Sequence, residues 1–171
     1  EIRDSSGIGL ELTYTSPAGE EGYPGNLAVK ALYVLSTSAN ELKIEYWAET
    51  DTATVVNLTN HAYYNLSAGA ENTILDHCIR IHAGFITPVD STLIPAGDLA
   101  PVDGTPFDLR SLTSICDRLD DKDQQMLLGM GFDHNFALQN NGSLEPAAQV
   151  VDSLSGRVLE VLTTKPGMNI P

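Results

Sequence analysis

Apolar and polar residues alternate with a period of two over much of the chain, and helical periodicity is nearly absent. In ELKIEYWAET, residues 41–50, Leu42, Ile44 and Tyr46 fall on one face, while Lys43 and Glu45 fall on the other. This alternation predicts a half-buried strand. LAVKALYVLS, just upstream, predicts a second strand, and the Ser, Asn and Thr of the intervening TSAN predict a turn. Together these segments predict a hairpin.

A second hairpin is predicted over residues 147–164, AAQVVDSLSGRVLEVLTT, with DSLSG as its turn. Residues 77–110 begin as a strand and then become dense in Pro, Gly and Asp, which predicts a long ordered loop with short strand pieces. Residues 111–129 predict one or two short helical turns. The pattern favours an all-β class, an antiparallel sandwich, and a single domain over residues 1–171.

The amino-acid composition limits the classes of partner that the chain can bind. A chain of 171 residues can bury one core, covering roughly 70% of its unfolded surface. With 9 Lys and Arg against 23 Asp and Glu, its net charge of -14 repels nucleic acid and anionic membranes, so a neutral or cationic small molecule fits better. No apolar run approaches the ~20 residues of a membrane span, and the first residues lack signal-peptide features. We expect a cytoplasmic protein, with secretion left open.

The two cysteines do not predict a metal or redox site. Cys78 and Cys116 lie 38 residues apart and form no Cys-x-x-Cys spacing, which argues against a zinc knuckle or a thiol redox pair. Free cysteines are usually buried small apolar residues. We therefore expect two buried thiols.

Candidate chemistry lies in NLTNHAYYNL, residues 57–66. Its β-branched and aromatic residues predict a strand, in which His61 shares a face with Thr59, Tyr63 and Asn65. Buried polar groups need partners, so this face is either a satisfied internal network or the wall of a polar pocket. From these residues alone, the internal network is the favoured interpretation.

Five segments, in order, resemble the galactose mutarotase (aldose 1-epimerase) family. They are SPAGEEGYPGNL, NLTNHAYYNL, TPVDSTLIPAGDLAPVDGTPFDLR, GFDHNF and SGRVLEVLTTKPG. The resemblance implies a large β-sandwich, a supersandwich, that interconverts the α and β anomers of free aldoses such as galactose and glucose. It also implies a small-molecule aldose as partner and no cofactor or metal.

The resemblance also implies roles for individual residues. In the family a histidine protonates the ring oxygen and a glutamate takes the proton of the anomeric hydroxyl; His61 matches that histidine. Histidine suits proton transfer near neutrality because its ordinary pKa is about 6.5. Asp133 of GFDHNF matches the aspartate that holds sugar hydroxyls, although FDHN alone would favour a simple turn. Tyr63, on the same predicted strand face as His61, is a candidate to line the pocket, with a packed aromatic as the equal alternative. His77, His82 and His134 are expected to be structural.

The chain also departs from the family pattern. The first dozen residues lack the family's sugar-contacting arginine and second histidine, and no glutamate here lies in the motif of the general base. We therefore expect an incomplete sandwich that is inactive alone. It would be part of a longer mutarotase, half of a split protein completed by a second chain, or a remnant that binds sugar without catalysis; the first is preferred. The alternative function is a non-catalytic carbohydrate-binding module. A hexose-phosphate epimerase is disfavoured because the chain shows no arginine cluster.

Overall fold

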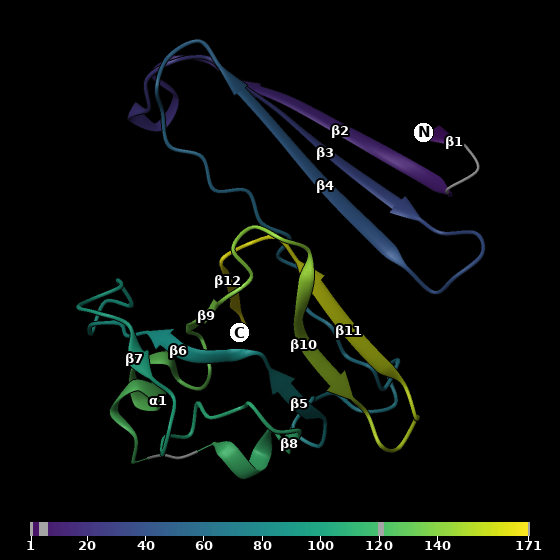
Figure 1. Cartoon of the computed structure of the whole chain (residues 1–171), viewed down its shortest axis with the longest axis vertical. Coiled ribbons are helices and arrows are strands. Elements are labelled where there is room, and N and C mark those ends of the chain that lie inside the picture. The colour runs from purple at the N-terminus through teal and green to yellow at the C-terminus, as the bar shows by residue number, and fades with distance from the viewer. Residues whose placement is uncertain (1, 4–6, 120–121, 171) are drawn as a thin grey trace. The chain divides into compact units, whose positions relative to one another are not determined.

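The computed structural model describes residues 2–3, 7–119 and 122–170, which form two compact units, Glu1–His61 and Ala62–Pro171. All of the strand pairings are antiparallel (Figure 1). The one α-helix among the described residues, α1 (Gln124–Gly129), spans six residues. These features confirm the all-β class. A single domain over residues 1–171 stays a prediction, because one fold can contain two compact units.

The first unit is a sheet in the order β1 (Ile2–Arg3), β2 (Ile8–Ser16), β3 (Leu27–Leu35) and β4 (Leu42–Thr50). The last three are long strands of nine residues each that run side by side (Figure 1). The predicted hairpin of β3 and β4 is confirmed. Strand β2 was not predicted, although its residues alternate in the same way.

The register of this sheet separates an apolar face from a mixed one. Leu12 pairs with Ala31, and Ala31 pairs with Tyr46, so these side chains form one row on the apolar face. Leu10, Tyr33 and Ile44 form the adjacent row on that face. Many of its large side chains are nevertheless about half exposed: Ile8, Leu10, Leu12, Tyr14, Leu35 and Leu42.

The mixed face carries charges and one indole. Lys30 Nζ lies 4.3 Å from the centroid of the Trp47 ring and 3.6 Å from Glu11 Oε2. Lys30 stands between its cross-strand neighbours Thr13 and Trp47, so the ammonium is placed over the indole by the register itself. This face is suited to contact with water.

The loop between β2 and β3 is built from tight turns. It contains a 3-10 turn, η1 (Glu20–Gly22), and then Pro24 and Gly25. Gly25 has φ of +78°, a left-handed conformation that favours glycine. The Asn26 side-chain amide donates to Asp51 Oδ2 at 2.7 Å, which fastens the loop to the end of β4 and lowers the pKa of the Asp51 carboxyl.

The strand predicted around His61 is wrong. Residues 53–65 form no strand, and none of them takes part in a sheet pairing. Strand propensity only describes residues that fit a pleated surface; a strand also needs a neighbouring backbone to complete its hydrogen-bond ladder. The argument that His61, Tyr63 and Asn65 share a strand face therefore fails.

The second unit contains two four-stranded sheets. One has the order β11 (Val158–Thr163), β10 (Glu145–Val151), β5 (Cys78–Ile81) and β8 (Thr113–Ser114). The other has the order β12 (Gly167–Asn169), β9 (Asn135–Leu138), β6 (Ala83–Thr87) and β7 (Ala100–Pro101). The predicted hairpin of β10 and β11 is confirmed, with Gln149 opposite Glu160.

A core fills the second unit. Its largest fully buried side chains are Phe107, Phe136, Ile81, Leu109, His134 and Val102. The expected long loop with short strand pieces follows β6, and the two expected helical turns are η2 (Cys116–Arg118) and α1. Helix α1 begins at a cap, because the Asp123 carboxylate accepts from the backbone N–H groups of Gln125 and Met126.

Two further features of the fold are the exposure of the cysteine thiols and the character of the helices. Both cysteines are free, but Cys78 is only half-buried and Cys116 is exposed, so the expectation of two buried thiols is wrong. Cys116 begins the 3-10 turn η2, and its exposed Sγ lies 3.2 Å from Ser114 Oγ. Among the described helices, none has the length and apolar character needed to cross a membrane.

Candidate functional site

His61 is exposed and ends the first compact unit. A hollow of about 250 Å³ is lined by residues of that unit's sheet, among them Tyr33 and Tyr46, and by Leu58 and Thr59. His61 is not among the residues that line this hollow. The segment just before His61 therefore lines the hollow through Leu58 and Thr59. The role of His61 stays a prediction.

The end of the NLTNHAYYNL segment is fastened by side chains. The Leu66 N–H donates to His77 Nε2 at 3.0 Å, and the Leu66 carbonyl accepts from Arg157 Nη1 at 3.0 Å and from Ser155 Oγ at 3.3 Å. This contact uses Nε2 of the buried His77 ring as a hydrogen-bond acceptor. His77 thus has the structural role expected of it.

Asn65 belongs to a turn, and Tyr63 is exposed. The Asn65 amide builds a turn: its Oδ1 accepts from the Ser67 N–H at 2.9 Å and its Nδ2 donates to the Glu71 carbonyl at 2.9 Å. Tyr63 is 72% exposed, so its ring is accessible to a ligand. Sugar binding by Tyr63 stays a prediction.

Asp133 lies at the centre of a tight turn. The His134 N–H donates to the Phe132 carbonyl across Asp133, and both neighbours are buried while Asp133 is exposed. The simple turn that FDHN alone favours is present, and the Asp133 carboxylate makes no hydrogen bond to any residue in the described ranges. The carboxylate is free to accept hydrogen bonds from a ligand.

Aromatic contacts hold this turn in place. The Phe107 ring centroid lies 4.7 Å from that of His134, 5.8 Å from Phe132 and 6.4 Å from Phe136. Residues 132, 134 and 136 therefore all face one buried ring, which directs Asp133 to the opposite side. Edge-to-face ring pairs each contribute about 0.5–1.5 kcal/mol beyond burial.

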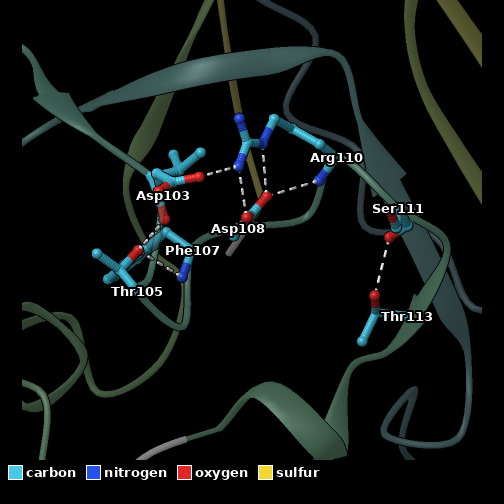
Figure 2. Close-up of polar contacts among 8 residues, drawn as sticks. Asp103, Thr105, Phe107, Asp108, Arg110, Ser111 and Thr113 are labelled. Atoms are coloured by element: carbon cyan, nitrogen blue, oxygen red, sulfur yellow. Dashed lines mark hydrogen bonds and ion pairs between the residues drawn. The ribbon is translucent and has the colours of Figure 1, made fainter.

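The loop that carries Phe107 is closed by an ion-pair clip, shown in Figure 2. The Arg110 guanidinium donates to both oxygens of Asp108, each at 2.7 Å, and to Asp103 Oδ1 at 2.7 Å. Arg110 lowers the pKa of the Asp108 carboxyl through the hydrogen bonds between them. Thr105 closes the loop further, because its hydroxyl donates to the Val102 carbonyl at 2.7 Å. The clip fixes the loop from which Phe107 enters the core.

His134 is fully buried beside Asp133 and is part of a polar network. Its Nε2 lies 3.0 Å from Gln125 Oε1, and the Gln125 amide also bonds both backbone groups of Val89. Burial lowers the pKa of the His134 imidazole, and the charges of Asp133 and Asp123 oppose that shift. The sequence offered one signal for this burial, the alternation of residues 132, 134 and 136, but Gln125 and Val89 lie too far away along the chain to be read from it.

Metal chemistry has no candidate centre in the described part of the chain. No three His, Cys, Asp or Glu side chains within the described ranges come close enough together to hold a metal ion. The expectation that the protein uses no cofactor or metal stays a prediction. What the described residues do offer for binding is the carboxylate of Asp133 on its buried aromatic support.

Comparison with known proteins identifies the family. The family model described as aldose 1-epimerase matches residues 2–170. The chain is 46% identical over 160 residues to human galactose mutarotase, covering 94% of this chain and 45% of that protein. It is 38% identical over 156 residues to aldose 1-epimerase of Escherichia coli, covering 90% and 44% respectively. The chain thus spans less than half the length of these relatives.

Solved structures agree with these matches. A galactose 1-epimerase from Lactobacillus acidophilus superposes with a TM-score of 0.78 and 34% identity, covering 88% of this chain and 43% of that one. An aldose epimerase homologue from C. elegans shares the fold, with a TM-score of 0.77 and 24% identity. The β-sandwich of the mutarotase type expected from the sequence is confirmed. The chain belongs to the aldose 1-epimerase family.

Proposed function

We propose that this chain is part of an aldose 1-epimerase that interconverts the α and β anomers of free hexoses such as galactose and glucose. Family membership and the activities for which the relatives are named support the reaction class. The observation that carries the proposal is the Asp133 carboxylate, which is exposed and held between two buried neighbours. A fixed carboxylate accepts several hydrogen bonds from hydroxyl groups and discriminates between sugars by their geometry.

In this proposal His61 is the general acid that protonates the ring oxygen, and Asp133 holds sugar hydroxyls. Ring opening of a hemiacetal needs one group that gives a proton and one that takes it, and each positioned group contributes about 10²- to 10⁴-fold. Exposed Tyr63 is a candidate wall of the sugar site. The general base is not assigned to any glutamate of this chain, and no cofactor is required for this chemistry.

The test is mutarotation of α-galactose followed by polarimetry, with the full protein that contains this chain. We expect His61→Ala to lower kcat by about 10²- to 10⁴-fold, and Asp133→Asn to raise KM. His82→Ala, at an exposed histidine near β5 and β6, is the matched control and should keep normal turnover. Undiminished turnover of His61→Ala would remove His61 from the mechanism. Galactose binding without any acceleration by the unmodified protein would favour the carbohydrate-binding module instead.

Two further expectations belong to this proposal. The half-exposed apolar face of β2, β3 and β4 supports a sandwich that is completed by a second chain or a further segment. Hydrogen exchange of β2 to β4 in the full protein tests this, because a covered face protects these strands and an open one does not. A cytoplasmic location is tested by fractionation of the source cells.

A further inference from the structure

We propose that His134 is a positioning residue for Asp133: its buried ring, hydrogen-bonded to Gln125 and packed against Phe107, fixes the direction in which the Asp133 carboxylate meets a sugar hydroxyl. This inference rests on the proposed sugar-binding role of Asp133. It adds a residue that does not touch the substrate and acts through its neighbour.

The hydrogen-bond network defines the state of the His134 ring. Gln125 Oε1 accepts from the Val89 N–H at 2.8 Å, and Gln125 Nε2 donates to the Val89 carbonyl at 3.1 Å, which settles the orientation of the amide. Because the oxygen of this amide faces His134 Nε2 at 3.0 Å, that nitrogen must carry the proton. The ring is therefore the neutral Nε2–H tautomer.

The other ring nitrogen has no partner. His134 Nδ1 is buried and makes no hydrogen bond to any residue in the described ranges. A second proton on this ring would need an acceptor at Nδ1 that the described surroundings do not supply. The site therefore holds a neutral ring with a single directional bond, which is a means of setting orientation rather than of moving protons.

Packing removes the remaining freedom of the ring. His134 is 0% exposed and its centroid lies 4.7 Å from that of Phe107. On another side, a Cβ added at Gly129 would lie 2.9 Å from His134 Cε1, so only glycine leaves room for the ring there. The ring is thus held by one bond, one aromatic contact and one close backbone approach.

This constraint reaches Asp133 through the tight turn. The His134 N–H donates to the Phe132 carbonyl, so the backbone on both sides of Asp133 is fixed by buried residues. The same network ties the turn to α1 through Gln125 and to the loop after β6 through Val89. Misplacing a substrate-holding group by about 1 Å can cost about 100-fold in rate. His134 therefore controls substrate affinity without contacting the substrate.

The test compares three variants in the full protein, with kcat and KM for galactose as readouts. His134→Phe keeps an aromatic ring but removes the donor to Gln125, and we expect KM to rise roughly 10- to 100-fold with a smaller change in kcat. His134→Gln places an amide N–H near the position of Nε2 and should recover most of the affinity. His82→Phe is the matched control at an exposed histidine and should change neither constant.

A double-mutant cycle separates positioning from general stability. If His134 acts through Asp133, then His134→Phe changes KM little when Asp133 is already Asn, because there is no carboxylate left to direct. Equal effects of His134→Phe in both backgrounds overturn the proposal. If Asp133→Asn alone leaves KM unchanged, the sugar-binding role of Asp133 fails instead, so the two failures are distinguishable.

A measurement on the unmodified protein covers the case in which His134→Phe does not fold. The ¹⁵N shifts of the His134 ring should show a protonated Nε2 and an unprotonated Nδ1 at neutral pH. The opposite tautomer overturns the proposal, because Gln125 would then receive no hydrogen bond. As a second variant, Gly129→Ala should raise KM by pressing on the ring while leaving every polar group in place.

Discussion

The two compact units use apolar side chains in opposite ways. In the first unit, β2, β3 and β4 each extend over nine residues, yet none of its described large apolar side chains is buried. In the second unit the strands have two to seven residues, and its buried side chains form a continuous cluster around Phe107 and Phe136. Regular strands thus do not make a core by themselves. Burial does, and in this chain it comes from short strands and ordered loops.

The strongest test of this contrast truncates one apolar side chain in each unit and compares the losses in unfolding free energy. Phe107→Ala should lower the free energy of unfolding of the second unit by about 3–5 kcal/mol, because it leaves a cavity at the centre of the core. In this chain on its own, Leu12→Ala, at a side chain that is 51% exposed, should cost about 0.5 kcal/mol. Urea unfolding of the two variants measures both values. A loss at Leu12 as large as that at Phe107 would mean that the apolar face is covered in solution.

Acid should weaken the second unit through His134. Burial lowers the pKa of this imidazole in the folded chain, against the opposing charges of Asp133 and Asp123, whereas an unfolded histidine has a pKa of about 6.5. The unfolded state therefore binds the proton more readily, so the stability due to neutral His134 is complete above pH ~6.5 and is lost as the pH falls towards the lowered folded pKa.

Urea midpoints measured as a function of pH test this expectation. The midpoint of the unmodified protein should fall more steeply below pH ~6.5 than that of His134→Gln, which has no imidazole to titrate. The comparison is needed because other groups, such as the Asp152 carboxyl with its lowered pKa, also lose stabilising contacts in acid. Parallel curves for the two proteins would contradict the assignment.

The smallest effect should come from the mixed face of the first unit. Lys30→Gln removes the cation over the Trp47 ring and the ion pair with Glu11. Exposed interactions of these kinds contribute about 0.5–1 kcal/mol, and the ion-pair part weakens with salt. Hydrogen exchange of β3 at low and high salt provides the measurement. An effect that exceeds the loss in Phe107→Ala would reverse the ranking of the two units.

Local patterns account for the part of the fold that could be predicted. The hairpins β3–β4 and β10–β11 follow from alternation and turn residues, because both are contacts between neighbouring segments. Strand β2 has the same alternation at Ile8, Leu10 and Leu12, and a closer count of that pattern would have found it. Residues 53–65 show the limit of such reasoning: the composition of a strand was present without a partner strand to pair with.

The candidate site was predictable only in its residue types. Asp133 was proposed from its motif, and the burial of His134 agrees with the structural role expected of it. The contacts that hold them could not be read from the sequence, since Gln125 joins Val89 across 36 positions. The prediction that Cys116 is buried was wrong for a related reason. Its exposure depends on the 3-10 turn in which it lies.

The hydrogen bonds that hold Leu66 bear on the order in which parts of the chain become ordered during synthesis. One of its partners, Arg157, lies 91 positions further along the chain, so a ribosome making roughly 5–20 residues per second completes that contact seconds after residue 66 emerges. Until then this turn can be restrained by His77, 11 positions away, and by the hydrogen bonds of Asn65 to Ser67 and Glu71. The Leu66 end of the histidine motif should therefore acquire its full set of contacts only late in synthesis, after Arg157 has emerged.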